Sequence, residues 1–246
     1  MRRVALPLLI VLLATGCSDT GGDDSENALA ADSPITIIHL GDVVAQGGRD
    51  SSTYRCFLDT MLHDAGVAFD FVGSRQKPAY GYDYTCPTDF DQDHEGWAGA
   101  RVGSLETDMM TTSVEALQPD VALISIGWEN ISSRQQGPAT AAEKLKSFIA
   151  DLQTVSPEIT LLVAQQIPCT YPLPWCTDDM PAFNDAIASF GSLSTDESTV
   201  IVVDMVTGFS LDYLRSSNLP NDAGDEFMAG RWMDALREAG VIGASD

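Results

Sequence analysis

The chain has few cations and very few histidines. Its 246 residues contain 13 Lys and Arg against 36 Asp and Glu, which gives a formal net charge of −23 at pH 7. Such a surface repels phosphate backbones and anionic headgroups, so we expect no nucleic-acid partner and membrane contact only through an anchor. Because there are only 3 histidines and no Cys-x-x-Cys pair, the usual zinc ligands are missing, and we expect no metal and no cofactor.

The sequence also lacks an apolar run long enough to cross a membrane as a helix. Residues 4–13 are apolar but make up only about half of the roughly 20 residues that a spanning helix needs. Arg2 and Arg3 precede this run and Ala14-Thr15-Gly16-Cys17 follows it, which is the order of a secretory signal peptide. The segment ending in Cys17 resembles a bacterial lipobox, in which the cysteine is lipidated. An ordinary cleavable signal peptide is the alternative.

This pattern divides the chain into three parts. Residues 1–16 are assigned to the signal peptide, and residues 17–32 to the lipidated cysteine and a tether that is too poor in large apolar residues to drive packing. Residues 33–246 are long enough for one domain with a sizeable core. We expect a monomer in the bacterial cell envelope, anchored by its lipid at the outer membrane or the cell surface.

Four cysteines remain after Cys17. An even number in an exported chain favours disulfides. Cys169 and Cys176 bound a short proline-containing loop that can close on itself, which leaves Cys56 and Cys86 as the second pair.

Apolar runs rich in Val, Ile and Leu alternate with amphipathic stretches along residues 33–246. This order is typical of a parallel sheet buried between helices. The sequence therefore predicts an α/β fold, a three-layer α/β/α sandwich around a five-stranded parallel sheet. The expected strands are residues 35–40, 68–72, 121–126, 160–164 and 200–203. The irregular stretch 74–100 is long for a compact domain, and such loops tend to carry function.

Several short motifs occur in a characteristic order. They are Ile37 to Asp42 with Gln46-Gly47-Gly48, Thr53-Tyr54-Arg55, Phe69 to Ser74, His94-Glu95-Gly96-Trp97-Ala98-Gly99, Pro119 to Gly127, and Pro220 to Gly224 with Met228-Ala229. Together they resemble the SGNH/GDSL-type hydrolases, in particular the carbohydrate-esterase branch that includes acetylxylan esterases. The resemblance covers nearly all of residues 33–246 and implies a flavodoxin-like sheet.

The resemblance also assigns the residues that give the family its name. The nucleophilic serine falls on Val43, and the oxyanion asparagine falls on Glu129. The catalytic aspartate and histidine fall on Ser216 and Leu219, and the oxyanion glycine alone is kept, as Gly99. The sequence thus predicts an SGNH-like domain with no intact catalytic set.

Two alternative sets of catalytic residues are weaker interpretations. Asp91 and His94 form a literal Asp-x-x-His, although the motif that contains His94 already accounts for it, and no histidine follows it in the chain. Ser125, Ser132 and Ser133 flank the third long strand, but none sits at a recognisable nucleophile turn.

The remaining side chains of the site suggest a ligand pocket. Asp42, Glu129 and His94 are expected to converge there, where carboxylates can do acid–base work or bind a cation, or can simply hold loop N–H groups. Trp97 and Trp128 are suited to sugar rings or to loop packing. With Gly99 these six residues form the predicted pocket.

Three functions stay open at this stage. The first is an inactive envelope protein that binds a carbohydrate or a small ester. The second is an ester hydrolase with a non-standard site, and the third is a structural lipoprotein without a ligand.

The lipobox predicts that Cys17 carries the anchor. Labelled fatty acid fed to the producing bacterium should enter the protein, and the Cys17→Ala variant should incorporate none, because no other residue can start the lipidated chain. Mass spectrometry of the mature N-terminus checks the site. A wild-type product that is exported without lipid would contradict the assignment and favour the ordinary signal peptide.

Overall fold

The computed structural model of the protein describes residues 33–48, 51–86, 89–133 and 136–243. From Ser33 onward the described residues form one compact unit. The predicted signal peptide, Cys17 and the tether lie outside the described residues. None of the helices in the described part of the chain has the length and apolar character needed to cross a membrane.

The centre of this unit is a parallel sheet with the strand order β2-β1-β4-β5-β6. These strands are Ile35–Gly41 (β1), Phe69–Val72 (β2), Val121–Ser125 (β4), Thr160–Ala164 (β5) and Val200–Val203 (β6). The predicted α/β class and all five predicted strands are confirmed. A sixth strand, Glu95–Gly96 (β3), was not expected; it pairs with β1 beyond the end of β2, so that Leu40 lies beside Glu95 and Gly41 beside Gly96.

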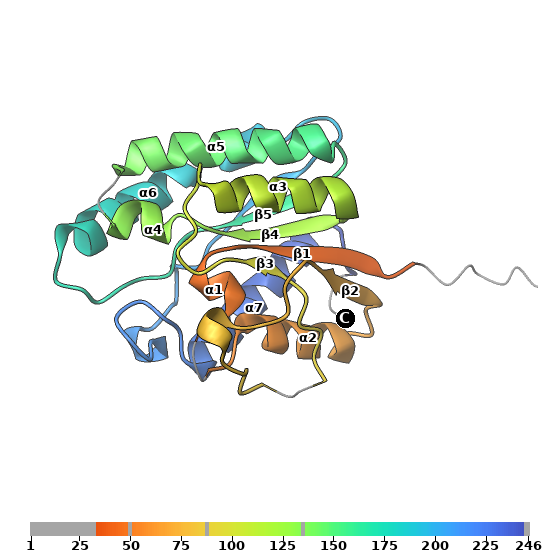
Figure 1. The fold of residues 1–246 in the computed structure, drawn as a ribbon, viewed down its shortest axis with the longest axis horizontal. Helices are drawn as coiled ribbons and strands as arrows, with labels where there is room; N and C mark the ends of the chain where they lie inside the picture. The colour runs from red at the N-terminus through yellow and green to blue at the C-terminus, as the bar shows by residue number, and fades with distance from the viewer. Residues whose placement is uncertain (1–32, 49–50, 87–88, 134–135, 244–246) are drawn as a thin grey trace, which may run out of the picture. The chain divides into compact units, whose positions relative to one another are not determined.

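Helices cover both faces of this sheet (Figure 1). On one face lie α3 (Leu105–Leu117), α5 (Pro138–Val155) and α6 (Met180–Ile187), and on the other lie α2 (Tyr54–Asp64) and α7 (Asp222–Glu238). Two short helices, α1 (Val43–Gln46) and α4 (Trp128–Ser132), follow the carboxyl ends of β1 and β4. The other short helical turns are η1 (Ala79–Gly81), η2 (Trp175–Asp179), η3 (Phe190–Leu193) and η4 (Leu211–Tyr213).

The two hydrophobic cores follow from the alternation of side chains along each strand. Ile38 and Ile124 point into the core beneath α3, α5 and α6, whereas Ile37 and Leu123 point into the core beneath α2 and α7. Because both faces are buried, strands of Val, Ile and Leu without polar interruption are what the sheet requires. His39 is an exception; it is fully buried against Phe71, and burial lowers its pKa far enough to keep the ring neutral.

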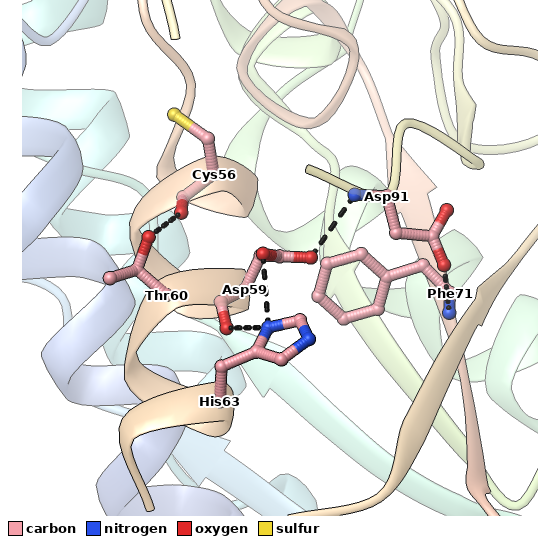
Figure 2. A network of polar contacts seen from close by, with 6 residues as sticks. All are labelled: Cys56, Asp59, Thr60, His63, Phe71 and Asp91. Atoms are coloured by element: carbon pink, nitrogen blue, oxygen red, sulfur yellow. Dashed lines mark hydrogen bonds and ion pairs between the residues drawn. The ribbon is translucent and has the colours of Figure 1, made fainter. Parts of the chain in front are cut away.

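The long stretch between β2 and α3 is held in place by polar contacts with α2 and β2. The backbone N–H of Asp91 donates to Asp59 of α2 at 3.1 Å, and the Asp91 carboxylate accepts the N–H of Phe71 in β2 at 2.8 Å (Figure 2). His63 lies one turn after Asp59, 3.2 Å from its carboxylate. The disulfide Cys56–Cys86 ties the same stretch to α2.

Arg55 of α2 completes this attachment. Its buried guanidinium donates to the carbonyls of Ala45 at 2.9 Å and of Gln92 at 2.9 Å, and it also bonds Tyr84. A single cation therefore joins α1, α2 and the long loop, and its charge is spread over strong carbonyl acceptors.

Both predicted disulfide pairings are present, Cys56–Cys86 and Cys169–Cys176. They span sequence separations of 30 and 7 residues. In the chain-entropy picture the longer loop contributes about 3.7 kcal/mol and the shorter about 2.5 kcal/mol to the free energy of unfolding.

We therefore expect the two double alanine variants to differ in stability. Replacing Cys56 and Cys86 should lower the free energy of unfolding more than replacing Cys169 and Cys176, because it relaxes the longer loop. Urea unfolding of the purified variants measures this difference. A larger loss for the 169/176 variant, or free thiols on the exported wild-type protein, would contradict the assignment.

Candidate functional site

The carboxyl end of β1 carries the first residues of the predicted site. Asp42 precedes α1 and caps it, since its Oδ1 accepts the N–H of Val44 at 3.1 Å. Val43 is the first residue of this helix and is half-buried. An isopropyl group therefore stands where the resemblance places a nucleophile.

The Asp42 carboxyl is fully buried. Burial raises its pKa from 3.8 to about 7; the Val44 N–H opposes this, and the nearby negative charge of Glu129 adds to it. Its Oδ2 has no hydrogen-bond partner among the residues that the structure describes. Asp42 is thus held close to its point of protonation at neutral pH.

The residues after β4 lie beside those after β1, because the two strands pair up to Gly41 and Ser125. Gly127 has φ 134°, a backbone conformation that favours glycine, and α4 starts at the next residue. Glu129 is half-buried on α4. Its carboxylate occupies the place that the resemblance assigns to an oxyanion-binding amide.

The neighbours of Glu129 serve the scaffold. Asn130 is fully buried and clamps Val102, accepting its N–H at 2.9 Å and donating to its carbonyl at 3.2 Å. Trp128 is only 6% exposed and meets Trp175 edge to face at a centroid distance of 5.3 Å. Trp128 therefore packs a loop, and its faces are not open to a sugar ring.

The motif around β3 reaches the same edge of the sheet, but most of its side chains turn inward. His94 is fully buried; its Nδ1 accepts the N–H of Gly96 at 2.9 Å, and its Nε2 lies 3.1 Å from the carbonyl of Lys77. Burial, with help from Arg55 and Arg75, lowers its pKa to about 2. His94 is thus a neutral structural residue.

Trp97 is also engaged. Its indole N–H donates to Glu95 at 3.1 Å, and the guanidinium of Arg75 lies 3.8 Å from its ring centroid. One face of the ring is therefore covered by a cation. Gly99, two residues later, is exposed with φ 86°.

The loop before α7 brings the last two predicted positions. Leu219 is half-buried, with its carbonyl accepting the Arg215 N–H at 3.0 Å, and Ser216 follows Arg215 in the same loop. Leu219 and Val43 line the same small cavity together with Arg215, and its volume is about 10 Å³. The two residues that the resemblance assigns to the nucleophile and the histidine therefore line one cavity, and both are apolar.

The alternative catalytic pairs are not assembled. The Asp91 carboxylate accepts backbone N–H groups from Phe71 and Asp93, and it does not orient His94. Ser125 lies buried within β4, and the Ser133 hydroxyl donates to the carbonyl of Glu129.

One polar cluster at this edge was not expected from the sequence. The Ser52 hydroxyl lies 2.6 Å from Asp222 and 2.9 Å from Asp225, and it has only one proton to share between them. Burial raises the pKa of Asp225 to about 7, although the Ser52 hydrogen bond and Arg215 oppose this. The cluster joins the segment before α2 to the start of α7, and Ser52, Leu219 and Asp225 line the same cavity.

The site offers little to a metal ion. Within the described ranges, no three His, Cys, Asp or Glu side chains come together as metal ligands would. Asp42 and Glu129 alone are too few for a hard cation, which takes about six oxygen ligands.

Comparisons with known proteins agree with the observed fold. No protein-family model matches the chain. A curated relative, the multidomain esterase of Ruminococcus flavefaciens, is 24% identical over 231 residues, or 86% of this chain. The chain spans 29% of the length of that esterase.

Two solved structures are similar over nearly their whole length. A serine-to-alanine mutant of an acetyl esterase with acetate ion has a TM-score of 0.70 at 24% identity and covers 83% of this chain and 97% of its own. A carbohydrate esterase of family 3 from Talaromyces cellulolyticus has a TM-score of 0.70 at 23% identity and covers 85% of this chain and 100% of its own. The chain therefore has the fold of the SGNH hydrolases.

The raised pKa of Asp42 predicts a pH-dependent stability. Because the folded state holds this proton up to about pH 7 and the unfolded state loses it near pH 3.8, the free energy of unfolding should fall as pH rises between these values. Asp42→Asn keeps the helix cap and removes the titrating carboxyl. Between about pH 5 and about pH 8 its free energy of unfolding should therefore fall less than that of the wild type, by on the order of a few kcal/mol.

Urea unfolding at both pH values measures this change. Asp151→Asn, at an exposed position on α5, is the matched control and should behave like the wild type. The same fall in stability in Asp42→Asn as in the wild type would show that this carboxyl is not the group that titrates.

Proposed function

We propose that this chain is an exported, lipid-anchored protein of the bacterial cell envelope whose SGNH-fold domain binds a carbohydrate or a small ester without hydrolysing it. The observation that carries the proposal is the meeting of Val43 and Leu219 in one cavity of about 10 Å³. These two side chains occupy the positions of the nucleophile and of the base.

The loss of reactive groups is large in energetic terms. Removing the nucleophile or the base of a Ser-His system lowers turnover about a millionfold, because the groups act as a unit. Neither Val43 nor Leu219 has an atom that can attack a carbonyl carbon or accept a proton. The fold alone therefore does not supply ester hydrolysis.

The shape of the site supports the same conclusion. A cavity of about 10 Å³ holds at most one water molecule. An acyl group placed for attack at Val43 would have to displace the side chains that fill this space. A ligand must then lie outside this cavity, at the edge of the sheet where Val43 and Glu129 are half-buried and Gly99 is exposed.

The electrostatics of the site oppose an anionic intermediate. Oxyanion stabilisation depends on donors aimed at the developing charge, and losing one donor costs about a hundredfold to a thousandfold in turnover. Glu129 offers a carboxylate at the position of such a donor, with Asp42 buried beside it. Uncharged ligands such as sugars and neutral esters are compatible with this field, whereas carboxylate ligands are not.

A second candidate function is hydrolysis through a carboxylate mechanism. One observation favours it, the pKa of about 7 at Asp42, which is the range of a general acid or base. Burial of Asp42 argues against it, since a proton-transfer group must reach the substrate.

The proposal predicts that the protein has no esterase activity. The purified protein should release no acetate from acetylated xylan or aryl acetates above background. Val43→Ser and Leu219→His should each stay silent alone, because one restored part cannot act without the others. Among these variants, acetate release is expected only from the fourfold one, which has a complete catalytic set. That variant combines Val43→Ser, Glu129→Asn, Ser216→Asp and Leu219→His.

Two controls separate the candidate functions. Asp42→Ala and Glu129→Ala remove the carboxylates that an unusual mechanism would use. Robust turnover by the wild type that either change abolishes would overturn the proposal in favour of the carboxylate mechanism.

A further inference from the structure

A second cavity, of about 410 Å³, lies beyond the carboxyl ends of β5 and β6. Gln165 follows the last residue of β5, Asp204 follows the last residue of β6, and both line the cavity. Neither Val43 nor Leu219 is among the residues that line it. The volume falls in the usual range of small-molecule sites, roughly 300–1,000 Å³, and ligands of open α/β sheets bind at this edge.

The walls of this β5–β6 cavity are fixed by bonds within the chain. The Asn184 amide brackets the backbone of Gln166, accepting its N–H and donating to its carbonyl, both at 2.8 Å. Asp204 accepts the N–H groups of Val206 and Thr207, each at 2.8 Å. The disulfide of the proline-containing loop forms a further wall. The cavity is therefore built before any ligand arrives, which lowers the entropic cost of binding.

The lining combines apolar surface with negative charge. Ile167, Met180 and Val206 supply apolar walls, and Asp185 and Asp204 supply two carboxylates. No lysine or arginine is among the described residues that line the cavity. A ligand that matches both features needs an apolar body and a positive charge.

Asp204 is charged when it meets such a ligand. Burial alone would raise its pKa, but the hydrogen bonds from Thr207 and Val206 outweigh burial, and the pKa lies below its usual value. Arg231 of α7 lies close enough to contribute, yet its guanidinium is held by the Thr207 carbonyl and lies over the Phe227 ring. Asp185 adds a second carboxylate to the lining, so the two negative charges exceed the one positive charge of Arg231.

We propose that the β5–β6 cavity is a binding site for a small organic amine with an apolar group. The ammonium pairs with Asp204 and Asp185, and the hydrocarbon part packs on Ile167 and Met180. This site is separate from the one at Val43. A negative result for amine binding here would therefore not affect the proposed lack of esterase activity, and the reverse also holds.

Three probes of one shape and different charge test this site. Benzylamine, benzyl alcohol and benzoate are titrated into the purified protein at neutral pH, and the methyl NMR signal of Met180 reports occupancy. Benzylamine should shift this signal saturably. Benzyl alcohol should bind with an affinity at least about tenfold lower than that of benzylamine, and benzoate should not bind.

Variants locate the charge that matters. Asp204→Asn keeps an oxygen for the Val206 and Thr207 N–H groups, and it should weaken benzylamine about tenfold while leaving benzyl alcohol unchanged. Asp185→Asn changes an exposed side chain of α6 and should also weaken benzylamine. Asp178→Asn, an exposed acid of the neighbouring turn η2 outside the lining, is the matched control and should have no effect.

Several outcomes would overturn the proposal. One is equal affinity for the three probes, and another is no shift of Met180 at millimolar benzylamine. A loss in Asp178→Asn as large as in Asp204→Asn would show general attraction to an acidic surface, which also contradicts a site.

Discussion

Three strands approach one another around Gly41 so closely that no side chain fits there. A Cβ on Gly41 would lie 2.1 Å from the Ser125 carbonyl oxygen, and a Cβ on Gly96 would lie 2.3 Å from the Gln46 nitrogen. This contact places the segments after β1, β3 and β4 at one edge of the sheet. The residues of the candidate site that follow these strands are positioned by it, directly or through α1 and α4.

Several buried contacts support this edge of the sheet. Arg55 and the Cys56–Cys86 disulfide hold the long loop, and Asn130 holds the segment after Gly99. In an active hydrolase such rigidity serves to keep reacting groups within tenths of an ångström. Here Val43 stands at this edge, and under the proposed function the rigidity serves recognition rather than chemistry.

Much of the fold could be predicted from the sequence, and the physical reasons are simple. Runs rich in Val, Ile, Leu and Phe made the five strands visible, although β2 carries the exposed Asp70, and the short spacing of Cys169 and Cys176 indicated their bond. Strand β3 was missed because two residues carry no periodicity. Helix α4 was missed because it has only five residues.

The site was harder to predict, because a sequence motif does not show in which direction a side chain points. Trp128 and His94 lie next to site residues in the chain, but packing on Trp175 and a bond to the Gly96 N–H turn them inward. The β5–β6 cavity joins residues of α6 and of the segments that follow β5 and β6, and these residues share no motif. Only the folded chain shows that their carboxylates and apolar groups meet.

The central claim is that no activated nucleophile remains on an SGNH scaffold. It is tested most directly by the intact mass of the purified protein after exposure to a fluorophosphonate, which forms a covalent adduct with activated serines. The account predicts an unchanged mass. A stoichiometric adduct on any serine, whether Ser51, Ser52 or Ser216, would contradict it.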